Sequence, residues 1–327
     1  MAEPNKSRIR ALGRVVGRPA EVALIQKISR SCQVHNVAVE RGIGDDCAVL
    51  RPSAQSDLVV TTDLFLEGRH FRRDWHSPAS AGHRCLARGL SDLAAMGAQP
   101  LAAFLSLALP RSFQVRWLDG FLRGFNDLAE RFGVELAGGD TAEAPGGLAL
   151  ADIVLVGSVP RGRALLRTGA RVGDGIYVSG TLGGSAVELR SLAAGARCPP
   201  RRRGTAQHPQ SFPEPRLALG QHLLQKRLAT AAMDLSDGLS TDLAHLCRCS
   251  GVGAKLDSAT LPLAHGASIA DALHGGEDYE LLFTSPRPLA ASVAGVNISR
   301  IGTITAAKAV ILDGKRLQAG GWEHFRS

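Results

Sequence analysis

Large apolar side chains recur at every third or fourth position between Ser112 and Phe132, and this spacing restricts the fold more than any other feature. The positions are Phe113, Trp117, Phe121, Phe125, Leu128 and Phe132. Side chains spaced in this way form one stripe along a helix. Gly133 follows the last of them, where glycine commonly ends a helix. The spacing predicts a strong amphipathic helix over Ser112–Phe132.

Other segments predict further helices and strands around this helix. Residues Glu21–Arg30 have helical spacing, and Ser77-Pro78 is typical of the first turn of a helix, which we expect to run to Met96 and stop at Gly97. Apolar runs predict strands over residues 58–62, 101–109, 148–159, 175–179, 254–257 and 279–284, with a hairpin turning at Asp313-Gly314. Long helices mixed with strands indicate an α+β (mixed α/β) protein.

The chain is long enough for two domains, each with its own core. It has 327 residues, and 45% of them are hydrophobic. We predict a basic N-terminal extension over 1–20 that is disordered, an N-terminal domain over 21–160 and a C-terminal domain over 161–327. Residues 196–215 are rich in Pro, Arg and Gln and predict a mobile loop within the second domain. No apolar run reaches the eighteen or so residues of a membrane helix.

Charge and cysteine usage exclude several classes of function. The formal net charge is +8, but the basic residues are scattered apart from Arg201-Arg202-Arg203, which is typical of a solvated loop. We therefore expect no nucleic-acid binding. The six cysteines form no C-x-x-C pair, so reduced thiols in a cytoplasmic protein are expected rather than a zinc site.

Acidic residues follow Gly, Ser or Thr at the ends of several apolar runs. Each one alone has an ordinary explanation as a turn or a helix cap. Asp92 is different, because it lies between Leu90 and Leu93 inside a predicted helix, where it cannot act as a cap. The acidic segments are Gly44-Asp45-Asp46, Thr61-Thr62-Asp63, Ser91-Asp92, Gly138-Gly139-Asp140, Asp234-Leu235-Ser236-Asp237 and Gly275-Gly276-Glu277-Asp278.

Carboxylates that converge on one site need cations, because they otherwise repel one another and lose hydration. Oxygen ligands favour Mg²⁺ or Ca²⁺ over zinc, and the neighbouring Thr and Ser hydroxyls add neutral oxygens. A site for several magnesium ions is typical of an enzyme that handles a nucleoside triphosphate. The sequence therefore predicts magnesium-dependent phosphoryl transfer from ATP.

The common nucleotide-binding signatures are absent from the sequence. Gly314-Lys315 is followed by Arg316 and lacks the upstream glycine, so it is not a P-loop, and no H-R-D or D-F-G kinase motif occurs. The glycine-rich segment Gly180–Ser185 fits a phosphate cradle or a tight strand-to-helix turn equally well.

Taken together, the motifs resemble the thiamine-monophosphate kinase family. The matching blocks run in order along the chain from about Glu21, and six blocks together are a specific signal. They are Gly42-Ile43-Gly44-Asp45-Asp46; Thr61-Thr62-Asp63 with Glu67-Gly68-Arg69-His70-Phe71; Ser91-Asp92-Leu93-Ala94-Ala95-Met96-Gly97; Gly138-Gly139-Asp140-Thr141; Asp234-Leu235-Ser236-Asp237-Gly238-Leu239; and Gly275-Gly276-Glu277-Asp278-Tyr279-Glu280-Leu281.

The resemblance implies ATP-dependent phosphorylation of thiamine monophosphate to thiamine diphosphate. It also implies the two-domain fold shared with aminoimidazole-ribonucleotide synthetase, with an N-terminal α/β domain that pairs in a homodimer and a C-terminal α/β domain that completes the ATP and substrate site. The partners expected are thiamine monophosphate and ATP. No association with a membrane is expected. The cofactor expected is Mg²⁺, in several copies.

The resemblance also assigns roles to individual residues. The magnesium shell it implies is Asp46, Thr61, Thr62, Asp63, Asp92, Asp140, Asp234 and Asp237. The ATP contacts it implies are Gly139, Asp140, Arg167 and Ser236, where Arg167 suits a phosphate oxygen. The thiamine side it implies is His70, Glu277 and Trp322, where the indole face suits a flat cationic ring.

No catalytic base is expected, since the acceptor phosphate is already ionised, and we predict direct in-line transfer. Two alternatives stay open at this point. One is another ATP-using enzyme of the same superfamily, similar to aminoimidazole-ribonucleotide synthetase or selenophosphate synthetase. The other is a non-catalytic nucleotide or magnesium sensor that keeps the fold.

Overall fold

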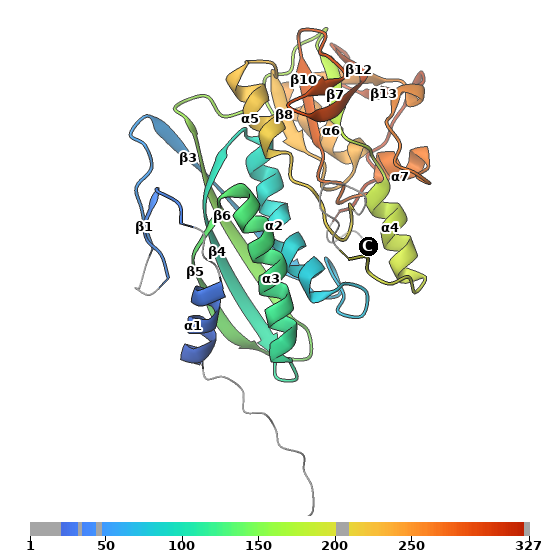
Figure 1. Cartoon of the computed structure of the whole chain (residues 1–327). Helices are drawn as coiled ribbons and strands as arrows, with labels where there is room; N and C mark the ends of the chain where they lie inside the picture. The colour runs from blue at the N-terminus through green and yellow to red at the C-terminus, as the bar shows by residue number, and fades with distance from the viewer. Residues whose placement is uncertain (1–20, 32–34, 44–47, 201–208, 324–327) are drawn as a thin grey trace, which may run out of the picture.

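A four-stranded sheet forms the frame of the first half of the chain in the computed structural model, which describes residues 21–31, 35–43, 48–200 and 209–323. The strand order is β3-β6-β4-β5, and only β4 and β5 run parallel. The strands are β3 (Ser56–Leu66), β4 (Gln99–Pro110), β5 (Glu135–Ala144) and β6 (Leu150–Pro160). Two long helices, α2 (Pro78–Ala95) and α3 (Val115–Phe132), cover one face of this sheet (Figure 1).

The limits of these two helices follow from local chemistry. The Ser77 side chain accepts a hydrogen bond from the Ser80 N–H at the start of α2, and Pro78 occupies the first turn. Helix α3 ends at Gly133, whose φ of 64° is the left-handed conformation that glycine adopts without strain. Both predicted helices are present, and the start of α2 and the end of α3 are as predicted, whereas α3 begins at Val115 rather than Ser112 and α2 ends at Ala95 rather than Met96. The helices also pack closely, because a Cβ on Gly124 would lie 1.9 Å from the Ala79 carbonyl oxygen.

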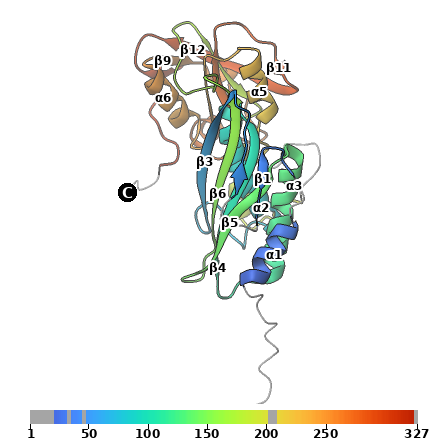
Figure 2. The same ribbon diagram turned by 90° about the vertical axis from the view of Figure 1, so that its left-hand side faces the viewer.

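The opposite face of the sheet is only partly covered. The short hairpin of β1 (Val39–Arg41) and β2 (Val49–Leu50) packs near Phe104 and Ala137, while α1 (Glu21–Ser31) lies against α3. Figure 2 views the molecule from this side, with β3 and β6 towards the viewer. Three large apolar side chains of β3 are exposed there, namely Leu58, Val60 and Leu64.

An eight-stranded mixed sheet organises the second half. Its order is β14-β13-β9-β12-β7-β10-β8, with β11 on the edge of β12. The strands are β7 (Gly175–Ser179), β8 (Ala231–Asp234), β9 (Gly253–Leu256), β10 (Leu281–Ser285), β11 (Ser292–Val293), β12 (Val296–Thr305), β13 (Val310–Leu312) and β14 (Lys315–Arg316). The helices are α4 (Gly184–Ala193), α5 (Leu217–Gln225), α6 (Leu239–Ser250) and α7 (Ile269–His274), with a 3₁₀ turn at Ser258–Thr260.

Helix α5 and the segment before it join the two halves. A Cβ on Gly220 of α5 would lie 1.8 Å from the Ala94 carbonyl oxygen, so this helix packs directly on α2. Gln210 and Ser211 are buried, and the Ser80 hydroxyl of α2 donates to the Ser211 carbonyl at 2.7 Å. The prediction of a mobile loop over 196–215 is therefore wrong for its last part, because polar groups of α2 hold that part in place. Residues 201–208 lie outside the described part of the chain.

Two further sequence-based expectations need correction. The strand predicted over 58–62 extends from Ser56 to Leu66, and Gly138-Gly139-Asp140, interpreted as a turn, lies in the middle of β5. The glycines weaken the apolar signal of β5, but the segment pairs with β4 in parallel from Glu135 to Ala144. None of the helices in the described residues is both long and apolar enough to cross a membrane.

Candidate active site

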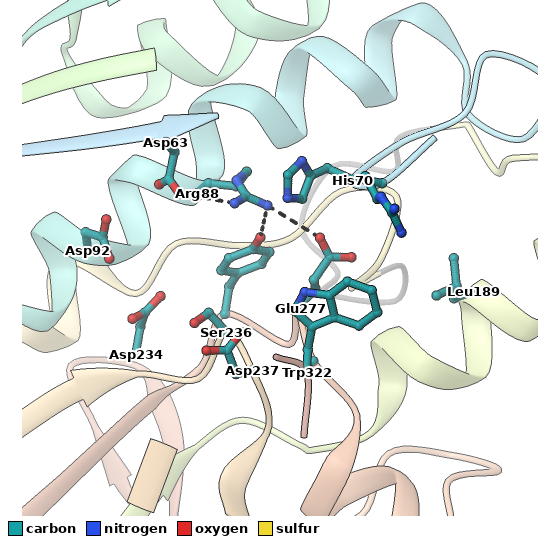
Figure 3. Close-up of a pocket in the computed structure, with 13 residues that line it drawn as sticks. Asp63, His70, Arg88, Asp92, Leu189, Asp234, Ser236, Asp237, Glu277 and Trp322 are labelled. Atoms are coloured by element: carbon teal, nitrogen blue, oxygen red, sulfur yellow. Dashed lines mark hydrogen bonds and ion pairs between the residues drawn. The ribbon is translucent and has the colours of Figure 1, made fainter. Parts of the chain in front are cut away.

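A cavity of about 340 Å³ lies between the two halves of the chain. Its walls come from β3, α2 and the 69–70 turn of the first half, and from α4, the loop after β8, the segment before β10 and the C-terminal segment of the second half (Figure 3). The lining residues are Asp63, Arg69, His70, Arg88, Asp92, Leu189, Asp234, Ser236, Asp237, Gly276, Glu277, Tyr279 and Trp322. Eight of these have a metal, ATP or thiamine role that the resemblance implies.

One wall of the cavity is acidic. Asp63 comes from β3, Asp92 from the inner stripe of α2 and Asp234 from the end of β8. Neighbouring hydroxyls orient two of these carboxylates: Thr61 donates to Asp92, and Ser91 donates to Asp234 at 2.7 Å. Two separate halves of the chain thus bring their acids to one place, as the sequence analysis predicted.

The acidic wall holds negative charge at an energetic cost. Burial, with the neighbouring charges of Asp234 and Asp63, raises the pKa of Asp92 from its ordinary value of 3.8 to about 7. Burial also raises the pKa of Asp234 and of Asp63. The positive charge of Arg167 acts in the opposite direction on Asp92 and Asp234. A site in which carboxylates resist ionisation is stabilised by a bound cation.

Asp242 holds the loop after β8 in position. Its carboxylate accepts three backbone N–H bonds of 3.1 Å, from Ser236, Asp237 and Gly238. Burial, with the nearby Asp237, raises its pKa to about 7. This arrangement directs Ser236 and Asp237 into the cavity, and the sequence analysis missed it because an acid in the first turn of a helix is ordinary.

The other wall of the cavity carries a carboxylate surrounded by donors. The Arg84 guanidinium is 1% exposed and lies 3.0 Å from Glu277, and the Gln210 amide donates to the same carboxylate at 3.0 Å. Burial alone would raise the pKa of Glu277, but the charges of Arg84 and Arg88 outweigh it and lower the pKa. Glu277 is therefore an ionised group whose charge the protein already compensates.

The backbone around Glu277 adopts an unusual conformation. Glu277 has a φ of 65° and Tyr279 a φ of 50°, both in the left-handed region that non-glycine residues rarely occupy. The Glu277 and Tyr279 N–H groups donate to the Ser236 and Leu235 carbonyls, at 2.8 and 2.9 Å. These bonds tie the segment to the loop after β8, so the strain serves to place two side chains in the cavity.

His70 and Trp322 complete the second wall. The Leu66 N–H donates to Nδ1 of His70 at 2.9 Å, so Nε2 is the ring nitrogen that carries the proton in the neutral form. Trp322 is 51% exposed, and its backbone N–H donates to the Asp237 carbonyl at 2.9 Å. An exposed indole at the mouth of a cavity can receive a flat ligand on its face.

The other described residues with sequence-based assignments do not line this cavity, although Thr61 donates to Asp92 at its wall. Thr62 and Asp140 are on the opposite, open face of the sheet, where Thr62 donates to Asp152 at 3.1 Å. Gly139 packs against β4, where a Cβ would lie 1.9 Å from the Leu105 carbonyl oxygen. Arg167 is exposed and does not line the cavity, and Asp46 lies outside the described residues. The cavity therefore unites only part of the proposed magnesium shell.

The glycine-rich segment after β7 is a tight turn whose amides are already bonded. The Asp278 carboxylate accepts from the Gly183 N–H at 2.6 Å and from the Ser185 N–H at 3.0 Å. These are the amides that a phosphate cradle would offer at the start of α4. Of the two interpretations left open by the sequence, the structure favours the turn.

Sequence reasoning gave no role to three residues of the site: Arg88 and Tyr279, which line the cavity, and Arg84, which is buried behind its wall and bonded to Glu277. Arg84 and Arg88 lie on the α2 stripe that also carries Asp92, and Tyr279 lies in a matching block of the sequence but was assigned no role. Charged residues spaced four apart on an otherwise small and apolar helix were the available signal, since such residues share one face. That signal does not distinguish a cavity from an exposed surface.

The donor set fits magnesium. Within the parts of the chain that the structure describes, no three His, Cys, Asp or Glu side chains converge closely enough to hold a metal ion alone. Mg²⁺ needs no such cluster, because it commonly takes one or two carboxylates from a protein and completes its shell with water and substrate phosphates. The cavity offers carboxylate and hydroxyl oxygens and no thiol, which suits a hard cation.

The two halves of the chain match a known pair of domains. Residues 44–159 match the family described as AIR synthase related protein, N-terminal domain, and residues 171–315 match AIR synthase related protein, C-terminal domain. The fold and the interdomain cavity thus define a member of this class of two-domain proteins.

Individual relatives give a narrower assignment. Thiamine-monophosphate kinase from Escherichia coli K12 is 38% identical over 325 residues, covering 93% of this chain and 98% of that protein. The crystal structure of thiamine-monophosphate kinase from Stenotrophomonas maltophilia K279a is 37% identical with a TM-score of 0.79, covering 90% of this chain and 97% of that one. The structure of AaThiL complexed with AMPPCP and TMP is 30% identical with a TM-score of 0.75, covering 93% and 97%. The chain belongs to the thiamine-monophosphate kinase family and is a phosphotransferase.

Proposed function

We propose that this enzyme transfers the γ-phosphoryl group of ATP directly to the phosphate of thiamine monophosphate, forming thiamine diphosphate, with several magnesium ions assisting. The observation that carries the proposal is the division of the cavity into an acidic wall and a wall with arginines, a histidine and an exposed indole. The relative AaThiL, complexed with AMPPCP and TMP, supports the choice of an ATP-type donor and this acceptor. The related sequences support an enzyme over a non-catalytic sensor.

The acidic wall is the proposed metal and ATP side. Bound magnesium would cancel phosphate charge and so permit two polyanions to approach. The protein ligands implied by the resemblance are Asp46, Thr61, Thr62, Asp63, Asp92, Asp140, Asp234 and Asp237; of these, Thr62 and Asp140 lie on the opposite face of the sheet and would have to act from there. The proposed ATP contacts are Gly139, Asp140, Arg167 and Ser236. For Asp63, Asp92, Asp234 and Asp237, the shared cavity supports the assignment.

The second wall is the proposed thiamine side. The exposed face of Trp322 suits a cationic thiazolium ring, and His70 lines the same cavity beside it. Glu277, already paired with arginines, contributes to the shape of the pocket and to the position of those arginines. The acceptor is an ionised phosphate, so no residue needs to remove a proton from it.

The purified protein is expected to form thiamine diphosphate from thiamine monophosphate only when ATP and Mg²⁺ are both present. Chromatography of the products measures this directly. EDTA in excess over Mg²⁺ should abolish turnover, and renewed excess Mg²⁺ should restore it, because the acidic wall then regains its cations. Release of ADP without thiamine diphosphate would contradict the proposed acceptor.

We further propose that the enzyme is a homodimer joined through the open face of its N-terminal sheet. Leu58, Val60 and Leu64 line up along β3 on that face and are 45%, 64% and 53% exposed. Contiguous exposed apolar side chains on a sheet face are typical of a protein interface. The same face of a second copy presents the same apolar side chains, so two copies related by a twofold axis would cover each other's exposed apolar surface.

Val60→Glu is expected to convert the dimer into a monomer, since it would bury two like charges near the symmetry axis. Sedimentation velocity of the variant and the wild type at equal concentration measures the change. Val172→Glu is a matched control, because Val172 is 61% exposed but lies in the second half of the chain. A Val60→Glu protein that sediments as the wild type does would rule out this face as the interface.

A further inference from the structure

The guanidinium of Arg88 occupies the junction between the two walls of the cavity. Its Nη2 donates to Asp63 of the acidic wall at 3.1 Å. Its Nη1 donates to the Tyr279 hydroxyl at 3.1 Å and lies 3.5 Å from Glu277 of the opposite wall. Figure 3 shows Arg88 between Asp63 and Glu277, with its guanidinium at the edge of the open space.

Arg88 has donor capacity beyond these contacts. A guanidinium carries five N–H donors, and Arg88 makes two hydrogen bonds among the described residues. Its Nε is buried there and has no hydrogen-bond partner. Arg84, one turn earlier on α2, donates to Gln210, His70 and Glu277 and is 1% exposed. Its guanidinium is therefore held by buried protein groups and does not face a ligand. Arg88 lines the cavity, whereas Arg84 does not.

The position of Arg88 matches the place where an acceptor phosphate must lie. This placement of the acceptor phosphate rests on the function proposed above. If the donor nucleotide binds at the acidic wall and the thiamine rings at the Trp322 wall, the phosphate of the acceptor lies between them, next to Arg88. Arginine binds phosphate through parallel, charge-assisted hydrogen bonds. Glu277 keeps Arg84 as its counter-ion when Arg88 turns to a ligand, so that movement leaves no carboxylate without a partner on this wall.

We propose that Arg88 binds the phosphate of the acceptor and so makes the enzyme select phosphorylated thiamine over free thiamine. The role is one of substrate specificity and positioning and includes no proton transfer. It differs from a purely structural role, in which Arg88 would only neutralise Asp63 and Glu277. The two roles predict different patterns of binding.

Calorimetric titration with thiamine monophosphate and with free thiamine, in buffer without ATP or Mg²⁺, distinguishes these roles. Arg88→Met keeps most of the side-chain volume and removes the charge. We expect it to weaken binding of thiamine monophosphate by about 10- to 100-fold, the range for loss of a charged hydrogen bond. Binding of free thiamine should change by less than about twofold, since it has no phosphate to lose.

Two further variants make the experiment decisive. Arg88→Lys keeps the charge and should recover part of the affinity for thiamine monophosphate even if Arg88→Met is poorly folded. Arg123→Met is the matched control, because Arg123 is exposed on α3 and should bind both ligands as the wild type does. Equal losses for both ligands in Arg88→Met, or no loss for either, would overturn the proposal while leaving the proposed kinase function intact. Wild-type protein that binds neither ligand and forms no thiamine diphosphate would instead contradict the proposed function itself.

Discussion

Asp63→Asn is expected to lower kcat for thiamine diphosphate formation by about 10²- to 10³-fold, the range for loss of one preorganised electrostatic group. Asp63 is the acid of β3 that faces the cavity, and its carboxylate also holds Arg88 at 3.1 Å. Asparagine keeps the size of the side chain and can still accept a hydrogen bond. The loss should therefore arise from the missing charge rather than from unfolding.

Initial rates at saturating ATP and Mg²⁺, together with thermal unfolding of each variant, measure this effect. Asp57→Asn is the matched control in the same strand, since Asp57 accepts from the Gly162 N–H far from the cavity. Its rate should stay within about twofold of the wild type. Near-normal turnover of folded Asp63→Asn would refute the metal assignment of the acidic wall.

Asp140→Ala tests the part of the predicted magnesium shell that the cavity does not include. Because Asp140 lies on the open face of the sheet, the sequence resemblance and the geometry disagree about its position relative to Asp63. A large loss of turnover in Asp140→Ala alone would place the reacting phosphates nearer the open face. The pair of variants thus locates the metal site.

The sequence predicted the frame of this fold well, for reasons that lie in local patterns. The apolar stripe of α3 and the Ser77-Pro78 start of α2 depend on near neighbours in the chain, so their signals survive without tertiary context. Strand β5 was missed because Gly138 and Gly139 imitate a turn, and only pairing with β4 makes that segment a strand. Tertiary context outweighed local propensity there.

The candidate site was predictable in its residue types but only partly in its geometry. Asp92 was identifiable because a carboxylate inside an apolar helix needs a compensating partner, and the structure gives it Thr61. The sequence could not show that Thr62 and Asp63 point to opposite faces of β3, although alternation along a strand explains it. Arg88 was not identifiable, because its role depends on Glu277 and Tyr279, nearly two hundred residues away in sequence.

Raising the pH is expected to destabilise the metal-free protein and to increase the stabilisation that Mg²⁺ provides. Burial raises the pKa of Asp92, Asp242 and Asp278 from 3.8 to about 7. Between about pH 4 and pH 7, these carboxyl groups therefore keep their protons in the folded protein and lose them in the unfolded chain. Stability that depends on such protons is complete below about pH 4 and is lost as the pH rises through about 7. His76 opposes this at lower pH, because burial lowers its pKa from 6.5 to about 4. Three acids outweigh this one histidine, so the net decline should be clearest between about pH 5 and pH 7 and should level off above that range.

Magnesium competes with protons for the acidic wall, which links its effect to pH. It binds ionised carboxylates, so its stabilising effect should grow over the same range in which Asp92 loses its proton. Thermal unfolding at about pH 6 and about pH 8, with and without excess Mg²⁺, measures both effects. Asp92→Asn should reduce the pH dependence of the magnesium effect, whereas Asp57→Asn, remote from the cavity, should preserve it. A magnesium shift of equal size at both pH values would mean that the ion binds groups already ionised at pH 6, and the buried acids of the cavity would not be its ligands.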